Sequence, residues 1–168
     1  DSAPMREFIR WYSQYQTEDG NIPDCADWEG TEWLPEFDAY GQFIYAVMEY
    51  HRFTGDTAFL EEMRPAVAKT LAYMESLRSR RLTAEYQTPE KRACYGLLPE
   101  SMSHEGYMAH PVHAYWDDFW ALRGLRDAAV MAEVLGDRQE ALRLAGVRDE
   151  FGENLRASLA AAIERHKI

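Results

Sequence analysis

The stretch VMEYHRFTGDTAFL, residues 47–60, decides the fold of this chain. Apolar side chains recur at three- and four-residue spacing on both sides of the Gly55-Asp56 pair, which is typical of amphipathic helices. Glycine suits the position just after a helix, and aspartate suits the N-cap of the helix that follows. The stretch therefore predicts two helices, over about 39–54 and 57–80, joined by a tight turn into an antiparallel hairpin.

A second turn of the same composition, Gly136-Asp137, lies 81 positions further along the chain. It predicts two more helices, over about 115–135 and 138–165, and apolar spacing predicts another from Ser2 to about Gln16. Pro65 falls inside the 57–80 helix, where we expect a kink or a restart. No alternating apolar run bounded by hairpin turns occurs, so we expect an all-α protein without strands.

Two long loops, residues 17–38 and 81–112, alternate with the two tight turns. At the 81-residue offset Glu36 falls opposite Asp117, and both lie at the entry to a helix. The helix interiors do not match, so the architecture repeats and the sequence does not. Antiparallel helices connected in this way place the tight turns on one side and the long loops on the other. Function usually lies on the side that carries the long loops.

The composition limits the possible partners. The 168 residues are 46% hydrophobic, and 18 Lys and Arg against 29 Asp and Glu give a net charge of −11. This acidic excess argues against nucleic acid or an anionic membrane surface as a partner, and no apolar run is long enough to span a membrane. No signal-peptide pattern is present, and Cys25 and Cys94 alone define no disulfide framework, so the compartment stays open.

Aromatic side chains gather in the first loop and at the start of the fourth helix, which hold four of the five tryptophans: Trp28, Trp33, Trp116 and Trp120. Sugar rings present flat C–H faces that stack on Trp and Tyr, while sugar hydroxyls bind carboxylates. A loop side that combines Trp, Tyr, Asp, Glu, His and Arg is therefore suited to a carbohydrate.

The first segment of interest, residues 27–38, carries five carboxylates interleaved with two tryptophans. Trp33, Glu36 and Asp38 are candidates for a sugar subsite. The structural alternative is an acidic loop in which Asp38 or Glu36 caps the following helix, where negative charge is favourable.

The second segment, residues 96–106, holds Glu100 and Glu105 in a loop whose glycines and prolines fix its path. A glycosidase needs one protonated carboxylic acid beside the scissile oxygen and a second carboxylate as base or nucleophile. Either glutamate fits that description, although an ordinary surface position is the alternative for both.

The third segment, residues 113–125, contains a cluster of candidate substrate-binding residues: His113, Tyr115, Trp116, Asp117, Asp118 and Trp120. The two aspartates point about 100° apart at a helix start, so one can face a cleft while the other caps. Phe119 is interpreted as ordinary core. The histidines have no zinc-ligand spacing and no nucleotide or nucleophile motif occurs, so we expect neither a metal nor a cofactor.

These residues resemble a known family. YWDDFWALRGL, residues 115–125, is similar to the tryptophan–aspartate segment that begins an inner helix in trehalase-like and glucoamylase-like six-hairpin glycosidases. The helix, Thr-Gly-Asp turn and helix of residues 45–73 and the loop end at residues 38–42 also resemble that superfamily. The resemblance implies an (α/α)6 toroid, of which residues 1–168 would supply a single all-α segment of about two and a half hairpins.

The resemblance also implies a function, glycoside hydrolysis by two carboxylates without a metal. Trp116 and Asp117 would hold the sugar beside the scissile bond, and Glu100 and Glu36 are the candidate catalytic pair by location alone. The expected partners are an oligosaccharide or glycoside substrate and the remainder of the toroid. The alternative is a non-catalytic carbohydrate-binding or helical scaffold module.

Overall fold

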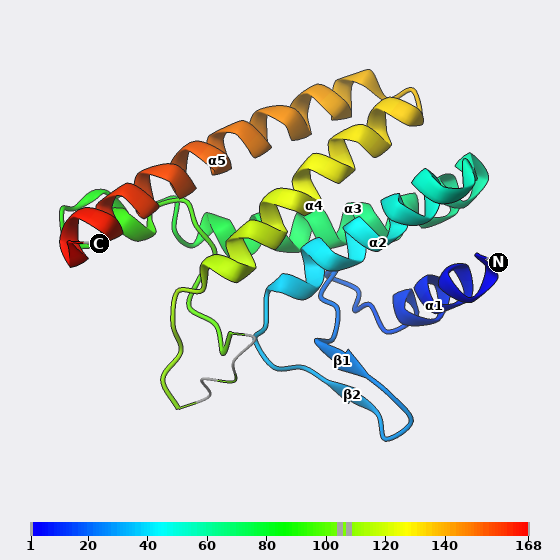
Figure 1. The fold of residues 1–168 in the computed structure, drawn as a ribbon, viewed down its shortest axis with the longest axis horizontal. Coiled ribbons are helices and arrows are strands. Elements are labelled where there is room, and N and C mark those ends of the chain that lie inside the picture. The colour runs from blue at the N-terminus through cyan, green and yellow to red at the C-terminus, as the bar shows by residue number, and fades with distance from the viewer. Residues whose placement is uncertain (1, 104–105, 107–108, 168) are drawn as a thin grey trace.

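The computed structural model describes residues 2–103, 106 and 109–167 (Figure 1). The described residues are mostly helical, as the sequence predicts, and contain five α-helices: α1 (Ala3–Ser13), α2 (Asp38–Thr54), α3 (Thr57–Ser79), α4 (Tyr115–Val134) and α5 (Arg138–His166). None of these helices is both long enough and apolar enough to cross a membrane. The candidate Glu105 and its neighbour His104 lie outside the described residues.

The expectation that strands are absent is wrong for the first long loop. Strand β1 (Cys25–Ala26) pairs antiparallel with β2 (Thr31–Glu32). Asp27 closes the turn between them, because its Oδ1 accepts the backbone N–H groups of Glu29, at 2.8 Å, and Gly30, at 3.2 Å. Two-residue strands are too short to produce an alternating apolar pattern, so the sequence pattern could not reveal them.

The two tight turns are confirmed. Gly55 follows α2 with a φ of 70°, a left-handed conformation that glycine adopts readily. Asp56 then caps α3 by accepting the N–H of Phe59 at 3.0 Å, and Asp137 caps α5 by accepting the N–H of Glu140 at 3.1 Å. The same chemistry thus closes both hairpins.

The structure adds detail around Pro65 and after α3. Helix α3 runs through Pro65 without interruption, so no restart occurs there. The second long loop contains two short 3₁₀ helices, η1 (Ala84–Gln87) and η2 (Arg92–Cys94). It is therefore partly ordered into turns before it reaches α4.

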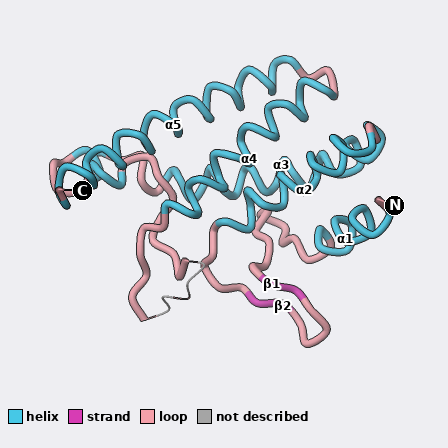
Figure 2. Tube along the Cα trace, in the orientation of Figure 1, coloured by secondary structure: helices cyan, strands magenta, loops and turns pink. Residues whose placement is uncertain are grey.

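Helix α4 lies between α2 and α5 and is the centre of the arrangement (Figure 1). The α2–α3 and α4–α5 turns lie at one end of the helices, while the long loops gather toward the other end (Figure 2). This is the division into a plain side and a loop side that the alternation of turns and loops predicts.

Two glycines allow α2 and α4 to approach closely. A Cβ on Gly41 would lie 2.0 Å from the backbone oxygen of Trp120, and a Cβ on Gly124 would lie 2.9 Å from the Cα of Gly41. Only glycine fits at such separations, because a side chain would overlap the backbone opposite. The backbones of the two helices therefore touch, and Ile44 is completely buried beside this contact.

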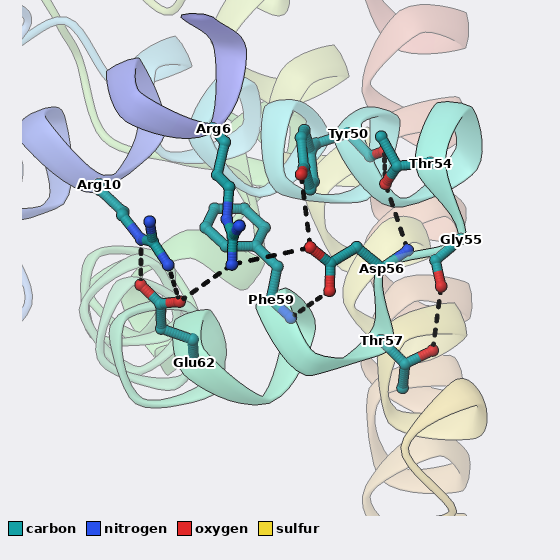
Figure 3. Close-up of polar contacts among 9 residues, drawn as sticks. All are labelled: Arg6, Arg10, Tyr50, Thr54, Gly55, Asp56, Thr57, Phe59 and Glu62. Atoms are coloured by element: carbon teal, nitrogen blue, oxygen red, sulfur yellow. Dashed lines mark hydrogen bonds and ion pairs between the residues drawn. The ribbon is translucent and has the colours of Figure 1, made fainter. Parts of the chain in front are cut away.

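Helix α1 is held against the start of α3 by its arginines (Figure 3). Arg6 and Arg10 both lie over the ring of Phe59, with guanidinium carbons 5.4 and 5.6 Å from its centroid. Arg10 also forms a paired hydrogen bond with the carboxylate of Glu62, and Arg6 lies 3.8 Å from Asp56. This contact places the other face of α1 against the first long loop.

Candidate functional site

A cavity of about 600 Å³ lies between α1, the first half of α2 and the first long loop. We call it the acidic–aromatic pocket, and its chemically distinctive lining residues are Tyr12, Asp24, Glu36, Asp38, Gln42, Tyr45 and Trp120. Three of the predicted site residues therefore share one pocket: Glu36, Asp38 and Trp120. Its walls come from three helices and a loop that are far apart in the sequence.

Asp38 is buried in the wall of this pocket, where its Oδ2 accepts two side-chain hydrogen bonds. The donors are Nε2 of Gln42 at 2.6 Å and Nε1 of Trp116 at 2.7 Å. The expectation that Asp38 caps α2 is wrong, because Phe37 occupies the N-cap position and no side chain caps the helix. The Trp116 bond instead joins the starts of α2 and α4.

Asp24 and Tyr12 fix the loop that closes the pocket. The Oδ1 of Asp24 accepts the backbone N–H of Leu34 at 2.9 Å, across the hairpin of β1 and β2. The Tyr12 hydroxyl donates to the carbonyl oxygen of Pro23, and burial raises the pKa of this phenol. The Asp24 bond closes the loop on itself and the Tyr12 bond ties it to α1, so the loop carboxylates are held near the helices.

The aromatic wall of the pocket is a chain of edge-to-face rings. Trp120 lies 5.6 Å from Tyr45 and 6.0 Å from Trp116, both in T-shaped geometry. The guanidinium carbon of Arg123 sits 4.5 Å from the centroid of the Tyr45 ring. These contacts hold Trp120 and Tyr45 in fixed orientations, as a stacking surface for a flat ligand requires.

Asp117 and Asp118 are both buried, and neither caps α4, whose N-cap is Ala114. The expectation that one of them caps is therefore wrong. Asp118 accepts the backbone N–H of Leu98 at 3.0 Å and so attaches the second long loop to α4. Burial raises its pKa to about 7.

The side-chain oxygens of Asp117 have no hydrogen bond of regular geometry to another described residue. Burial raises its pKa to about 6, and the carboxylates of Asp38 and Glu36 contribute to the rise. The Ser101 side chain and the Phe37 backbone lie near enough to lower the pKa of Asp117 in part, although neither meets the geometry of a hydrogen bond. Asp117 is thus a buried carboxyl that takes up a proton close to neutral pH, behind the carboxylates of the pocket.

Glu100 lies apart from the residues that line the acidic–aromatic pocket. Its carboxylate pairs with Arg81 and with Nε2 of His113, which is 3.1 Å away. Partial burial acts to raise the pKa of Glu100, but a backbone hydrogen bond and the charges of His113 and Arg81 outweigh it and hold the pKa below its usual value. An ionised Glu100 suits a base or nucleophile rather than a general acid.

Two further residues that the sequence predicts to bind substrate, Trp33 and Tyr115, lie outside the acidic–aromatic pocket. Trp33 is 45% exposed and donates its indole N–H to the hydroxyl of Thr31 at 2.9 Å. The hydroxyl of Tyr115 lies 2.8 Å from that of Ser158 and joins α4 to α5.

The sequence reasoning missed four polar or aromatic residues of the pocket: Tyr12, Asp24, Gln42 and Tyr45. Helical spacing would have found two of them, because Gln42 and Tyr45 follow Asp38 by four and seven positions on one face of a helix. Asp24 and Tyr12 carried no such signal, since only the fold brings α1 and β1 to this place.

No group of three His, Cys, Asp or Glu side chains in the described part of the chain is arranged to hold a metal ion. In comparisons with known proteins, the chain matched no protein-family model, no curated protein and no solved structure. What the pocket can bind is therefore inferred from its own residues and geometry.

Proposed function

We propose that the acidic–aromatic pocket binds a saccharide and that the chain is part of a carbohydrate-active protein of the glycoside hydrolase type. The observation that carries the proposal is one cavity of about 600 Å³ that combines three carboxylates with the rings of Tyr45 and Trp120. The volume falls within the range of small-molecule sites. Carboxylates accept hydrogen bonds from sugar hydroxyls, while the rings pack on the C–H faces.

Hydrolysis needs two carboxyl groups, and we propose Glu36 and Glu100 for these roles. Glu36 lines the pocket, where it would act as the acid. Glu100 is kept ionised by its surroundings, as the lowered pKa indicates, and would act as the base on a water molecule in an inverting reaction. Trp116 and Asp117 support the site from behind, Trp116 through its hydrogen bond to Asp38.

A second candidate function is saccharide binding without hydrolysis. The observation in its favour is that Glu100 is engaged by Arg81 and His113 and is not among the residues that line the pocket. In either case the helical hairpins would form part of an (α/α)6 toroid, with the remainder of the ring as a structural partner.

The binding proposal is tested by titrating mono- and disaccharides into the protein while recording tryptophan fluorescence and heat. Trp120→Phe should abolish most of the fluorescence response, because Trp120 lines the pocket. Trp28→Phe is the matched control and should preserve it, since Trp28 is 89% exposed at the tip of the hairpin. A lack of any response across a broad glycan panel would overturn the proposal.

The catalytic proposal needs a separate assay on chromogenic glycosides. Glu36→Gln and Glu100→Gln should each abolish hydrolysis while saccharide binding persists, and Glu29→Gln, on the exposed turn between β1 and β2, is the control. Binding without hydrolysis by the parent protein would select the second candidate function. Full hydrolysis by both Gln variants would exclude the assigned pair.

A further inference from the structure

A second cavity, of about 550 Å³, lies along the junction of α4 and α5. We call it the α4–α5 groove, and the residues used below are Phe119, Leu122 and Arg126 of α4 with Arg148, Gly152 and Arg156 of α5. Phe119, which the sequence predicts to be core, is 51% exposed here. The expectation for Phe119 is therefore wrong, because no described element packs over that part of α4.

The side chains of two arginines of the α4–α5 groove, Arg126 and Arg156, form no ion pair or hydrogen bond with any described residue. The other two are satisfied, since Arg123 pairs with Asp127 and Arg148 pairs with Asp149. Both side chains are exposed, and the groove is lined by four arginines and two carboxylates, Asp149 and Glu153. The groove thus presents free positive charge beside an exposed aromatic ring.

The two free arginines converge on the middle of the groove. Tyr115 contacts Ser158 at one end of the helix pair, and a Cβ on Gly152 would lie 3.8 Å from Leu122. Side chains on a helix lean toward its N-terminus. In these antiparallel helices that direction takes Arg126 toward Leu122, and a guanidinium nitrogen of Arg156 lies over Gly152.

The internal repeat indicates what belongs in this groove. At the 81-residue offset Phe119, Leu122 and Arg126 of α4 correspond to the α2 positions 38, 41 and 45. Those three α2 positions are where α4 itself packs, through the Trp116 hydrogen bond, the backbone contact at position 41 and the Trp120 ring contact. The face of α4 that lines the groove is therefore equivalent to a face that receives a helix.

The α5 side of the groove supports the same equivalence. Positions 148, 149 and 152 correspond to 67, 68 and 71 of α3. In α3 these three residues lie against Ala128, Met131 and Ala132 of α4. Both walls of the α4–α5 groove thus repeat the two walls between which α4 is seated. A hairpin of this architecture accepts one helix in the groove between its two members.

Charge pairs between helices form across the equivalent α2–α4 interface. Arg123 of α4 pairs with Glu49 of α2, 3.4 Å away, and Arg52 of α2 pairs with the completely buried Asp127 of α4. At the 81-residue offset Glu49 and Arg52 correspond to Val130 and Glu133, so the charges of the α4–α5 groove are its own and do not repeat those of α2. The Arg126 and Arg156 side chains have no carboxylate partner among the described residues. We infer that the groove docks an acidic amphipathic α-helix of a partner polypeptide, with apolar residues over Phe119 and Leu122 and carboxylates on Arg126 and Arg156.

This inference does not depend on saccharide binding, because it rests on the repeat and on the charges of the groove. The probe is a fluorescein-labelled helical peptide of about 20 residues with Leu and Ala on one face and Glu at positions i, i+4 and i+7, a spacing that follows the helix repeat. A matched peptide carries Lys in place of Glu. Fluorescence anisotropy is recorded as the 168-residue protein is added.

The Glu peptide should bind saturably and at least about tenfold more tightly than the Lys peptide. The double variant Arg126→Glu/Arg156→Glu should reverse this preference, and Phe119→Ala should weaken both. Arg165→Glu, a reversal at an exposed arginine near the end of α5, is the control and should change nothing. Circular dichroism verifies that each variant keeps its helices.

Equal binding of the two peptides, or a preference that the double variant leaves unchanged, would overturn the inference. So would saturable binding of inorganic phosphate that the double variant abolishes, with no binding of either peptide, because the groove would then be a site for a small anion. Self-association of the protein that the double variant abolishes, with no peptide binding, would assign the groove to a second copy of this chain and equally reject the inference.

Discussion

The indole Nε1 of Trp116 donates a hydrogen bond to Oδ2 of Asp38, 2.7 Å away, and this bond joins the first turns of α4 and α2. Asp38 is 4% exposed, and its other side-chain donor is Gln42 on its own helix. The contact therefore connects the helix starts that follow the first and the second long loop.

Replacing Trp116 with Phe should lower the free energy of unfolding by roughly 2 kcal/mol, because a hydrogen bond to a buried carboxylate is lost. Urea denaturation followed by circular dichroism measures the change. Trp33→Phe is the matched control and should have little effect, since that indole donates to Thr31 on an exposed loop. Equal losses in the two variants would contradict a special role for the Asp38 bond.

Replacing Gly41 with Ala should destabilise the protein by more than about 3 kcal/mol. The new Cβ would lie 2.0 Å from a backbone oxygen of α4, which cannot move without separating the helices. Gly146→Ala is the opposite case, because nothing lies within 4 Å of its added Cβ in the interior of α5. That variant should gain about 1 kcal/mol from helix propensity, and thermal unfolding of both tests the pair.

The stability of the protein should fall as the pH rises from 5 to 8. Burial raises the folded-state pKa of Asp117 to about 6 and that of Asp118 to about 7, above the ordinary value of 3.8. Both carboxyls therefore favour folding while protonated, and this contribution is lost as the pH rises through the folded values. The expected loss in the free energy of unfolding is roughly 2–4 kcal/mol.

Asp118→Asn removes the contribution of Asp118 to this pH dependence, because the amide does not titrate. Its oxygen still accepts the N–H of Leu98. We expect a flatter profile above pH 6, measured by urea unfolding at a series of pH values. Glu133→Gln, at an exposed position of α4, is the control and should leave the profile as it is. A stability that increases over this range in the parent protein would refute the assignment.

The contact of α1 with α3 should depend more on Phe59 than on its ion pairs. Phe59 is completely buried beneath two arginines, and Phe59→Ala should cost about 3–5 kcal/mol. Glu62→Gln should change stability little, because its pair with Arg10 is exposed to solvent and screened by salt. Limited proteolysis between α1 and β1 reports the release of α1, which only the first variant should show.

The helices and turns were predictable because their signals are local. Gly55 and Asp56 are enough to predict the end of one helix and the start of the next, and in the structure they cap α2 and α3. The short sheet was not predictable, because its turn depends on Asp27 accepting two backbone donors rather than on an apolar pattern.

The site was predictable in part. Glu36, Asp38 and Trp120 belonged to segments already rich in acids and tryptophans, and they share the acidic–aromatic pocket. Asp24 joins them only because the first loop folds back along α1, which no short pattern records. Phe119 has helical core spacing, yet the surface over it is open, since sequence spacing cannot show whether a neighbouring helix is present.

Because of the contact between Gly41 and Gly124, the width of the acidic–aromatic pocket and the chemistry of its lining are set by different residues. The distance from α2 to α4 is set where backbone meets backbone, so the span between Tyr45 and Trp120 does not depend on which side chains line the cavity. The wall residues are thereby free to vary in ligand preference while the frame keeps its dimensions. Directed evolution of this protein toward new ligands should therefore hold the two glycines constant and diversify the lining.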